Sequence, residues 1–252
     1  LMEGGNAVDA AVATAATLNV VEPQSTGVGG DVFALIWMND EKRVRALNAS
    51  GRSPKGASLN ELVSQGMADI PIQSPYAVTV PGAVSGWELA VKKYGTLPLS
   101  ELLKPAIQYA LKGYPVSEII SASWKANAYK LQSRPSGREL LVDNGPPRWG
   151  EVIKLPELAR TLECISEGGS EAFYKGPTAK KIADYVKTCG GWLSLDDMIN
   201  HEANWVEPIF TDYRGFRCWQ CPPNGQGINV LMALNIAESF DISGMGFQTA
   251  DT

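Results

Sequence analysis

The sequence predicts a single α+β or α/β domain in which helices outnumber strands. Its 252 residues match one large domain or two small ones, and no linker, repeat or low-complexity run divides them. Segments with helical spacing of apolar residues outnumber the few apolar strand segments. Hydrophobic residues make up 44% and charged residues 19%, which excludes disordered, collagen-like and coiled-coil classes.

The first fifty residues predict a helix followed by a hairpin. Asn6 is expected to cap a buried, alanine-rich helix over 7–21 that ends at Glu22-Pro23. Residues 32–38 are apolar throughout, which predicts a central strand, and 43–48 form the returning strand.

The glycines at 27, 29 and 30 precede this strand and follow a helix. A phosphate-binding loop has the opposite order, strand then glycines then helix. A nucleotide-binding module is therefore the disfavoured alternative. It would require ATP or NAD to raise the thermal stability of the protein.

The rest of the chain predicts helices joined by Gly- and Pro-containing loops, with one more hairpin. Arg134–Gly150 is expected to be an irregular surface excursion, and residues 209–219 form a hairpin turning at Tyr213-Arg214-Gly215. A short helix before His201 leaves that histidine exposed at its end. The longer helices are expected at 85–95, 99–113, 117–131, 154–167, 177–188 and 226–239.

Charge and composition disfavour nucleic-acid binding and a membrane span. Lys and Arg number 22 against 27 Asp and Glu, so a net charge of −5 gives nucleic acid no general attraction. No stretch approaches the roughly 18 uncharged apolar residues of a membrane span.

Cysteine and histidine usage narrows the chemistry further. Four cysteines are too few for a disulfide framework in a chain of this length, and Cys218-x-x-Cys221 lies at a strand end, where buried thiols are favoured over a redox or zinc motif. With His201 as the one histidine, a site with several imidazole ligands is impossible within this chain. Reduced cysteines favour the cytoplasm, and a periplasmic or extracellular location stays open.

Several segments, taken together and in order, resemble the gamma-glutamyltransferases and their acylase relatives. Each motif is weak alone, but their collinear run is specific. The matching segments are Gly4-Gly5-Asn6-Ala7-Val8-Asp9-Ala10-Ala11, Glu22-Pro23 with Gly27-Val28-Gly29-Gly30, Val80-Pro81-Gly82-Ala83-Val84-Ser85-Gly86, Pro98-Leu99 through Gly113, Ala172-Phe173-Tyr174-Lys175-Gly176, Gly190-Gly191-Trp192-Leu193-Ser194-Leu195-Asp196-Asp197, Tyr213-Arg214-Gly215 and Pro222-Pro223-Asn224-Gly225-Gln226-Gly227.

The resemblance implies an N-terminal nucleophile hydrolase with a four-layer αββα sandwich, to which two subunits of one precursor contribute strands. Residues 1–252 are expected to be the large-subunit region, incomplete at both ends. The nucleophile is then a threonine beyond this chain, exposed by autoproteolysis, whose own amino group serves as base. Thr252 is given no catalytic role. No metal or organic cofactor is implied.

The resemblance also suggests substrate-binding residues. The family's arginine for the substrate α-carboxylate aligns with Ser50, which cannot form that bidentate pair. Arg52 can bind substrate or serve only as a loop cation, and both interpretations stay open. Asn224 and Gln226 can hydrogen-bond an amide or only build a turn. For Gly29-Gly30-Asp31, close packing is favoured over substrate contact.

The activity implied by the resemblance is hydrolysis or acyl transfer on a small amide or gamma-glutamyl compound, as in a glutathione hydrolase. A beta-lactam-side-chain or general amide acylase is the alternative enzyme, and a catalytically silent scaffold or binding protein is the alternative from another class. The expected partner is the small subunit of the same precursor. A homo-oligomer stays open.

Overall fold

The structure is a computed structural model that describes residues 1–249, so Thr252 lies outside the described residues. It begins with helix α1 (Ala7–Val21). Asn6 Oδ1 accepts from the backbone N of Val8 and Asp9 at 2.9 and 3.1 Å, and Asp9 Oδ2 accepts from Asn6 N at 2.8 Å. This reciprocal cap fixes the start of the helix at the predicted residue.

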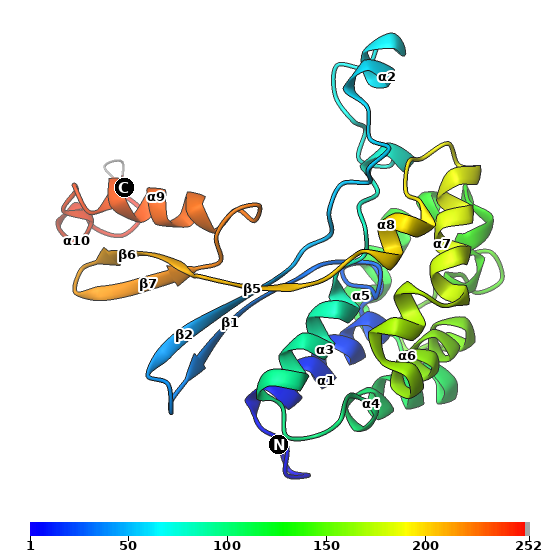
Figure 1. The fold of residues 1–252 in the computed structure, drawn as a ribbon, viewed down its shortest axis with the longest axis horizontal. Coiled ribbons are helices and arrows are strands. Elements are labelled where there is room, and N and C mark those ends of the chain that lie inside the picture. Colours follow the sequence, from blue (N-terminus) through cyan, green and yellow to red (C-terminus); the bar gives the residue numbers. More distant parts are fainter. Residues whose placement is uncertain (250–252) are drawn as a thin grey trace.

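A three-stranded antiparallel sheet follows, with strand order β1-β2-β5. Its strands are β1 (Val32–Met38), β2 (Arg43–Ala49) and β5 (Asn204–Val206). One face packs on α1 and α3 (Ala83–Tyr94), as Figure 1 shows. The predicted hairpin is confirmed, but the central position expected for β1 is wrong within residues 1–249, where β1 forms an edge.

The two faces of β1 differ in their environment. Ala34 and Ile36 pack against the helices. Phe33, Leu35 and Trp37 alternate with them and remain 41%, 41% and 57% exposed on the opposite face. An apolar strand open on one face accounts for a sequence pattern that resembles a central strand.

The helical body contains most of the core. α4 (Leu99–Lys112) packs on α1 and on α6 (Pro156–Tyr174), and α7 (Pro177–Thr188) and α8 (Leu195–Ile199) follow. α6 runs past its predicted end at 167 because the helix kinks rather than stops at Gly169, where φ is 63°. The remaining elements are α2 (Leu59–Ser64), α5 (Glu118–Gln132), the short strands β3 (Tyr114–Pro115) and β4 (Val152–Ile153), and the 3-10 helices η1 (Pro75–Ala77) and η2 (Pro135–Leu140).

The C-terminal unit extends away from the helical body and joins it through β5 (Figure 1). The predicted hairpin is confirmed as β6 (Ile209–Tyr213) and β7 (Phe216–Gln220). α9 (Gly227–Ala237) lies on this hairpin with only Leu231 buried, and α10 (Ile242–Met245) follows.

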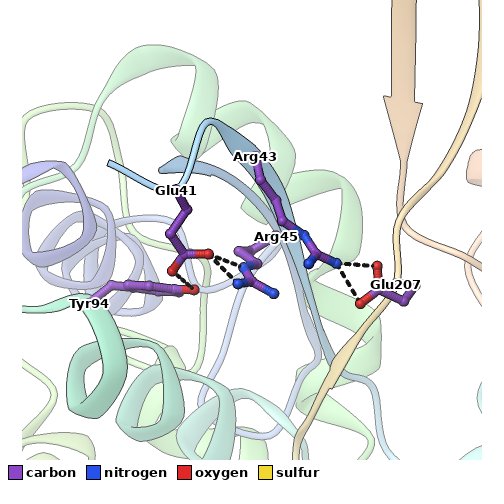
Figure 2. A network of polar contacts seen from close by, with 5 residues as sticks. All are labelled: Glu41, Arg43, Arg45, Tyr94 and Glu207. Carbon is purple, nitrogen blue, oxygen red and sulfur yellow. Dashed lines mark hydrogen bonds and ion pairs between the residues drawn. The ribbon is translucent and has the colours of Figure 1, made fainter. Parts of the chain in front are cut away.

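A polar network joins the β1–β2 hairpin to its neighbours (Figure 2). Glu41 accepts a hydrogen bond from Tyr94 Oη at 3.1 Å and pairs with Arg45, which lowers the pKa of the Glu41 carboxyl. Arg43 pairs with Glu207, just beyond β5, at 2.5 Å. Within residues 1–249, no helix combines the length and the apolar character needed to cross a bilayer.

Candidate functional site

The end of β2 and the turn before α9 meet on the sheet face opposite α1 and α3. Asn224 Nδ2 donates to Ser50 Oγ at 2.7 Å. Asn48 Nδ2 donates to Asn224 Oδ1 at 3.1 Å, and Ser50 N donates to Asn48 Oδ1 at 2.9 Å. Two of the four predicted substrate-binding residues, 174 positions apart, are therefore in direct contact. We call Asn48, Ser50 and Asn224 the amide cluster.

The turn is held over the sheet by close packing. A Cβ on Gly225 would lie 3.5 Å from the Phe33 ring, and the Cys221 thiol lies 3.7 Å from Ala34 O. Burial raises the pKa of the Cys221 thiol. The four cysteines are free, so the buried-thiol prediction is confirmed for Cys221, while Cys218 is half-buried. Within residues 1–249, no group of three or more His, Cys, Asp and Glu residues could hold a metal ion.

Sequence reasoning missed Asn48. It lies two residues before Ser50 at the end of the same strand, and alternate residues of a strand face the same side. That alternation, together with the polar side chain of Asn48, could have identified it as a neighbour of Ser50. Its register partner is Phe33, whose ring supports the turn.

The segment after Ser50 is fixed by its backbone. Gly51 N donates to Asp31 Oδ1 at 2.8 Å, and Val80 N donates to Arg52 O at 3.0 Å. Arg52 is exposed, forms no ion pair within residues 1–249, and has no hydrogen bond to the amide cluster there. Arg52 therefore lies two residues after Ser50 in the chain, but its guanidinium does not bond to the Ser50 hydroxyl.

Gln226 lies at the start of α9 and is exposed. Its carbonyl accepts from Asn229 N at 3.0 Å, and its side chain does not cap the helix. The amide of Gln226 is thus available to a ligand two residues from Asn224.

The glycine loop 27–30 precedes β1, the order that disfavours a phosphate loop. The sequence predicts close packing at Gly29 and Gly30, and the structure shows it only at Gly30. A Cβ on Gly30 would lie 3.2 Å from Gly27 O, whereas a Cβ on Gly29 would have nothing within 4 Å. A much closer approach occurs at Gly82, where a Cβ would lie 2.0 Å from Ala49 O. Gly82 N also donates to Gly30 O at 2.9 Å, so these glycines allow the loop, β2 and α3 to converge.

The expectation of an exposed His201 is wrong. Its side chain is 6% exposed, and its ring packs 5.3 Å from the Tyr174 ring. After α8 the chain continues into β5, which pairs with β2, and this path buries the histidine against Tyr174 at the end of α6. Burial and the nearby Arg52 guanidinium lower the pKa of His201, despite opposing effects of Asp31 and Glu202.

Other motifs of the resemblance stabilise the fold. Asp9 accepts from Thr96 N and Oγ1 at 3.1 and 2.5 Å, and Asn6 Nδ2 donates to Tyr94 O at 2.6 Å. Asp197 Oδ1 accepts from Lys55 N at 3.0 Å. These carboxylates are therefore backbone acceptors that join separate segments.

Comparison with solved structures defines the class of the fold. A cephalosporin acylase from Bacillus halodurans superposes with a TM-score of 0.93 at 40% identity, covering 100% of this chain and 48% of that one. A gamma-glutamyltranspeptidase from Helicobacter pylori superposes with a TM-score of 0.92 at 32% identity, covering 99% and 73%. The fold is that of the N-terminal nucleophile hydrolases, as the resemblance implied.

The chain belongs to the gamma-glutamyltranspeptidase family, whose sequence profile matches residues 1–252. The glutathione hydrolase-like YwrD proenzyme of Bacillus subtilis (strain 168) is 40% identical over 245 residues, which are 96% of this chain and 46% of that protein. The glutathione hydrolase proenzyme of Escherichia coli (strain K12) is 35% identical over 257 residues, covering 100% and 44%. The chain thus spans about half the length of the curated relatives it matches.

Proposed function

We propose that the protein containing this chain is an amide hydrolase and acyltransferase related to the gamma-glutamyltransferases, of the glutathione hydrolase type. The observation that carries this proposal is the family match over all 252 residues. The convergence of Ser50 and Asn224 on one sheet face supports a substrate-binding role for the amide cluster.

In this proposal the nucleophile is an N-terminal threonine, freed by autoproteolysis, in the half of the protein outside these residues. Its hydroxyl oxygen attacks the amide carbonyl carbon and its own amino group accepts the hydroxyl proton. That proton passes to the leaving amine when the carbon–nitrogen bond breaks. Water or a second amine then attacks the carbonyl carbon of this ester and loses a proton to the threonine amino group, and the threonine oxygen leaves and regains that proton. No histidine is required, which agrees with a chain whose one histidine is buried.

The proposed partner is the small subunit of the same precursor, and three surfaces support it. β1 presents an unpaired edge within residues 1–249. Phe33, Leu35 and Trp37 expose apolar area on the face away from α1. On α9, Val230, Met232 and Ile236 are 48%, 56% and 63% exposed. Exposed apolar side chains grouped on one strand face and on one helix are typical of an interface.

The first experiment is intact mass spectrometry of the protein expressed from its full reading frame. Two fragments, the smaller beginning at threonine, are expected. A single unprocessed mass would contradict the enzyme proposal and support a silent homologue with the same fold. Native mass spectrometry of the same sample gives the number of copies in the assembly.

A second candidate function, an acylase for groups without an α-carboxylate, is favoured by one observation. Ser50 stands where the family's arginine is expected and already bonds to the neutral Asn224 amide. The family's bidentate contact with a carboxylate is therefore missing at this position.

Two anilides separate these candidates. We expect gamma-glutamyl p-nitroanilide to be hydrolysed no faster than butyryl p-nitroanilide if the acylase is correct. Ser50→Arg should then raise kcat/KM for the gamma-glutamyl compound about tenfold and leave the butyryl compound unchanged. A strong preference of the parent protein for the gamma-glutamyl compound would instead assign carboxylate binding to another cation such as Arg52.

A further inference from the structure

A polar pocket lies beside the glycine loop, between the C-terminal half of α1 and the start of α3. Its volume is about 410 Å³, within the range of small-molecule sites. Its walls come from α1, from the loop before β1, and from α3. We call it the α1–α3 pocket. Its polar lining comes from Asn19, Gln24, Ser25, Thr26, Asp31 and Trp87.

Four of these side chains contain buried polar atoms that have no hydrogen-bond partner within residues 1–249. They are Asn19 Oδ1, Gln24 Oε1, Thr26 Oγ1 and Trp87 Nε1. Asn19 is 5% exposed and Trp87 is 2% exposed. Buried polar groups in native proteins nearly always have partners, so four unpaired atoms on side chains that surround one pocket are a ligand-binding signal.

The chemistry of the lining defines what could pair with it. Asn19 Oδ1 and Gln24 Oε1 only accept hydrogen bonds, and Trp87 Nε1 only donates. Asp31 is the sole charged residue in the lining, and no cation accompanies it. A complementary compound therefore carries a positively charged donor group and, near it, a hydrogen-bond acceptor.

We propose that the α1–α3 pocket binds a small compound with a primary ammonium group beside a carbonyl or carboxylate, such as an amino acid or amino-acid amide. The ammonium group pairs with Asp31 and the two amide oxygens. The carbonyl or carboxylate accepts from Trp87 Nε1 and Thr26 Oγ1.

The pocket also touches the candidate functional site through one residue. Asp31 Oδ1 accepts from Gly51 N at 2.8 Å, directly after Ser50. Binding at Asp31 is thus coupled to the segment that carries Ser50 and Arg52. The binding proposal itself does not depend on the proposed enzymatic function, because it rests on different side chains.

The test is isothermal titration calorimetry on the protein expressed from its full reading frame. Glycinamide carries both required groups, whereas acetamide lacks the ammonium group and N-acetylglycine replaces it with an uncharged amide. We expect glycinamide to bind, acetamide to bind at least about tenfold more weakly, and N-acetylglycine not to bind.

Two variants locate the binding. Thr26→Val removes one donor with little change in shape, Trp87→Phe removes another with a smaller ring, and each should weaken glycinamide binding about three- to tenfold. Trp149→Phe is the matched control, because Trp149 is 70% exposed and does not line this pocket. Thr26→Val serves as the second test if Trp87→Phe fails to fold.

Three results would overturn the proposal. Glycinamide could fail to bind, acetamide could bind as tightly as glycinamide, or glycinamide binding could persist unchanged in Thr26→Val and Trp87→Phe. The last result would place the amine elsewhere, including at an acyl-acceptor site. Loss of autoprocessing with glycinamide binding intact would refute the proposed enzyme and leave the α1–α3 pocket standing.

Discussion

Replacing Gly51 by alanine should disrupt the join between β2, Asp31 and the loop before α3. A Cβ at this position would lie 1.6 Å from Val80 O and 2.7 Å from Val80 C. Both obstacles are backbone atoms, so no side-chain rotation relieves the overlap. The two segments must separate, which breaks the 3.0 Å bond from Val80 N to Arg52 O.

The magnitude follows from these two costs. Overpacking costs about 1–3 kcal/mol, and loss of a backbone hydrogen bond costs about 0.5–1.5 kcal/mol. We expect a loss of about 3 kcal/mol, which lowers the thermal midpoint by about 6–12 °C for a cooperative unit of 150–250 residues. Because Ser50 is the preceding residue, kcat/KM for anilide substrates should also fall.

The assay is differential scanning calorimetry of the full-length protein at one scan rate. Gly29→Ala is the matched control, because a Cβ there has nothing within 4 Å and its φ is not positive. It should leave the midpoint unchanged or slightly raised. A Gly51→Ala midpoint within about 2 °C of the parent would refute the packing argument.

Three further substitutions test the electrostatics. Asp9→Asn should lower the free energy of unfolding by about 1–3 kcal/mol at pH 7. Burial raises the pKa of Asp9, but the hydrogen bonds from Thr96 and Asn6 outweigh it and lower the pKa overall. In acid titrations the stability difference between parent and variant should therefore vanish as the pH falls through the folded pKa. The parent should lose stability as the pH falls below about 6.5, because unfolded His201 binds a proton before the folded form does, and His201→Phe should lack that slope in unfolding scans. Arg43→Ala should cost less than about 1 kcal/mol in the same scans, since its pair with Glu207 is exposed; a larger cost would mean that the pair anchors β5.

Local patterning predicted much of the helical structure. The 7–21 and 177–188 helices match their predicted bounds because caps and prolines mark their starts and the periodicity is clear. The helix predicted over 154–167 ends too early, because two consecutive glycines such as Gly168 and Gly169 usually end a helix. Here Ser170 N donates to the Glu88 carboxylate, and the chain continues as a helix to Tyr174. α2 and the two-residue strands β3 and β4 were not predicted, since such short elements have little periodicity.

The candidate site was only partly predictable. Ser50 and Asn224 were identified from motifs, yet their contact and the role of Asn48 depend on how β2 and the turn before α9 pack. His201 was misplaced because a helix end is usually exposed, and pairing between β5 and β2 draws this one inward.

The sequence by itself determined the family, the order of helices and strands, and the presence of one histidine within these 252 residues, because these depend on local patterns and residue counts. Only the tertiary structure decided that β1 is an edge within residues 1–249, that Ser50 meets Asn224, and that four side chains with unpaired polar atoms surround the α1–α3 pocket. These features join residues far apart in the chain. Their positions depend on packing and strand pairing rather than on the residues beside them in sequence.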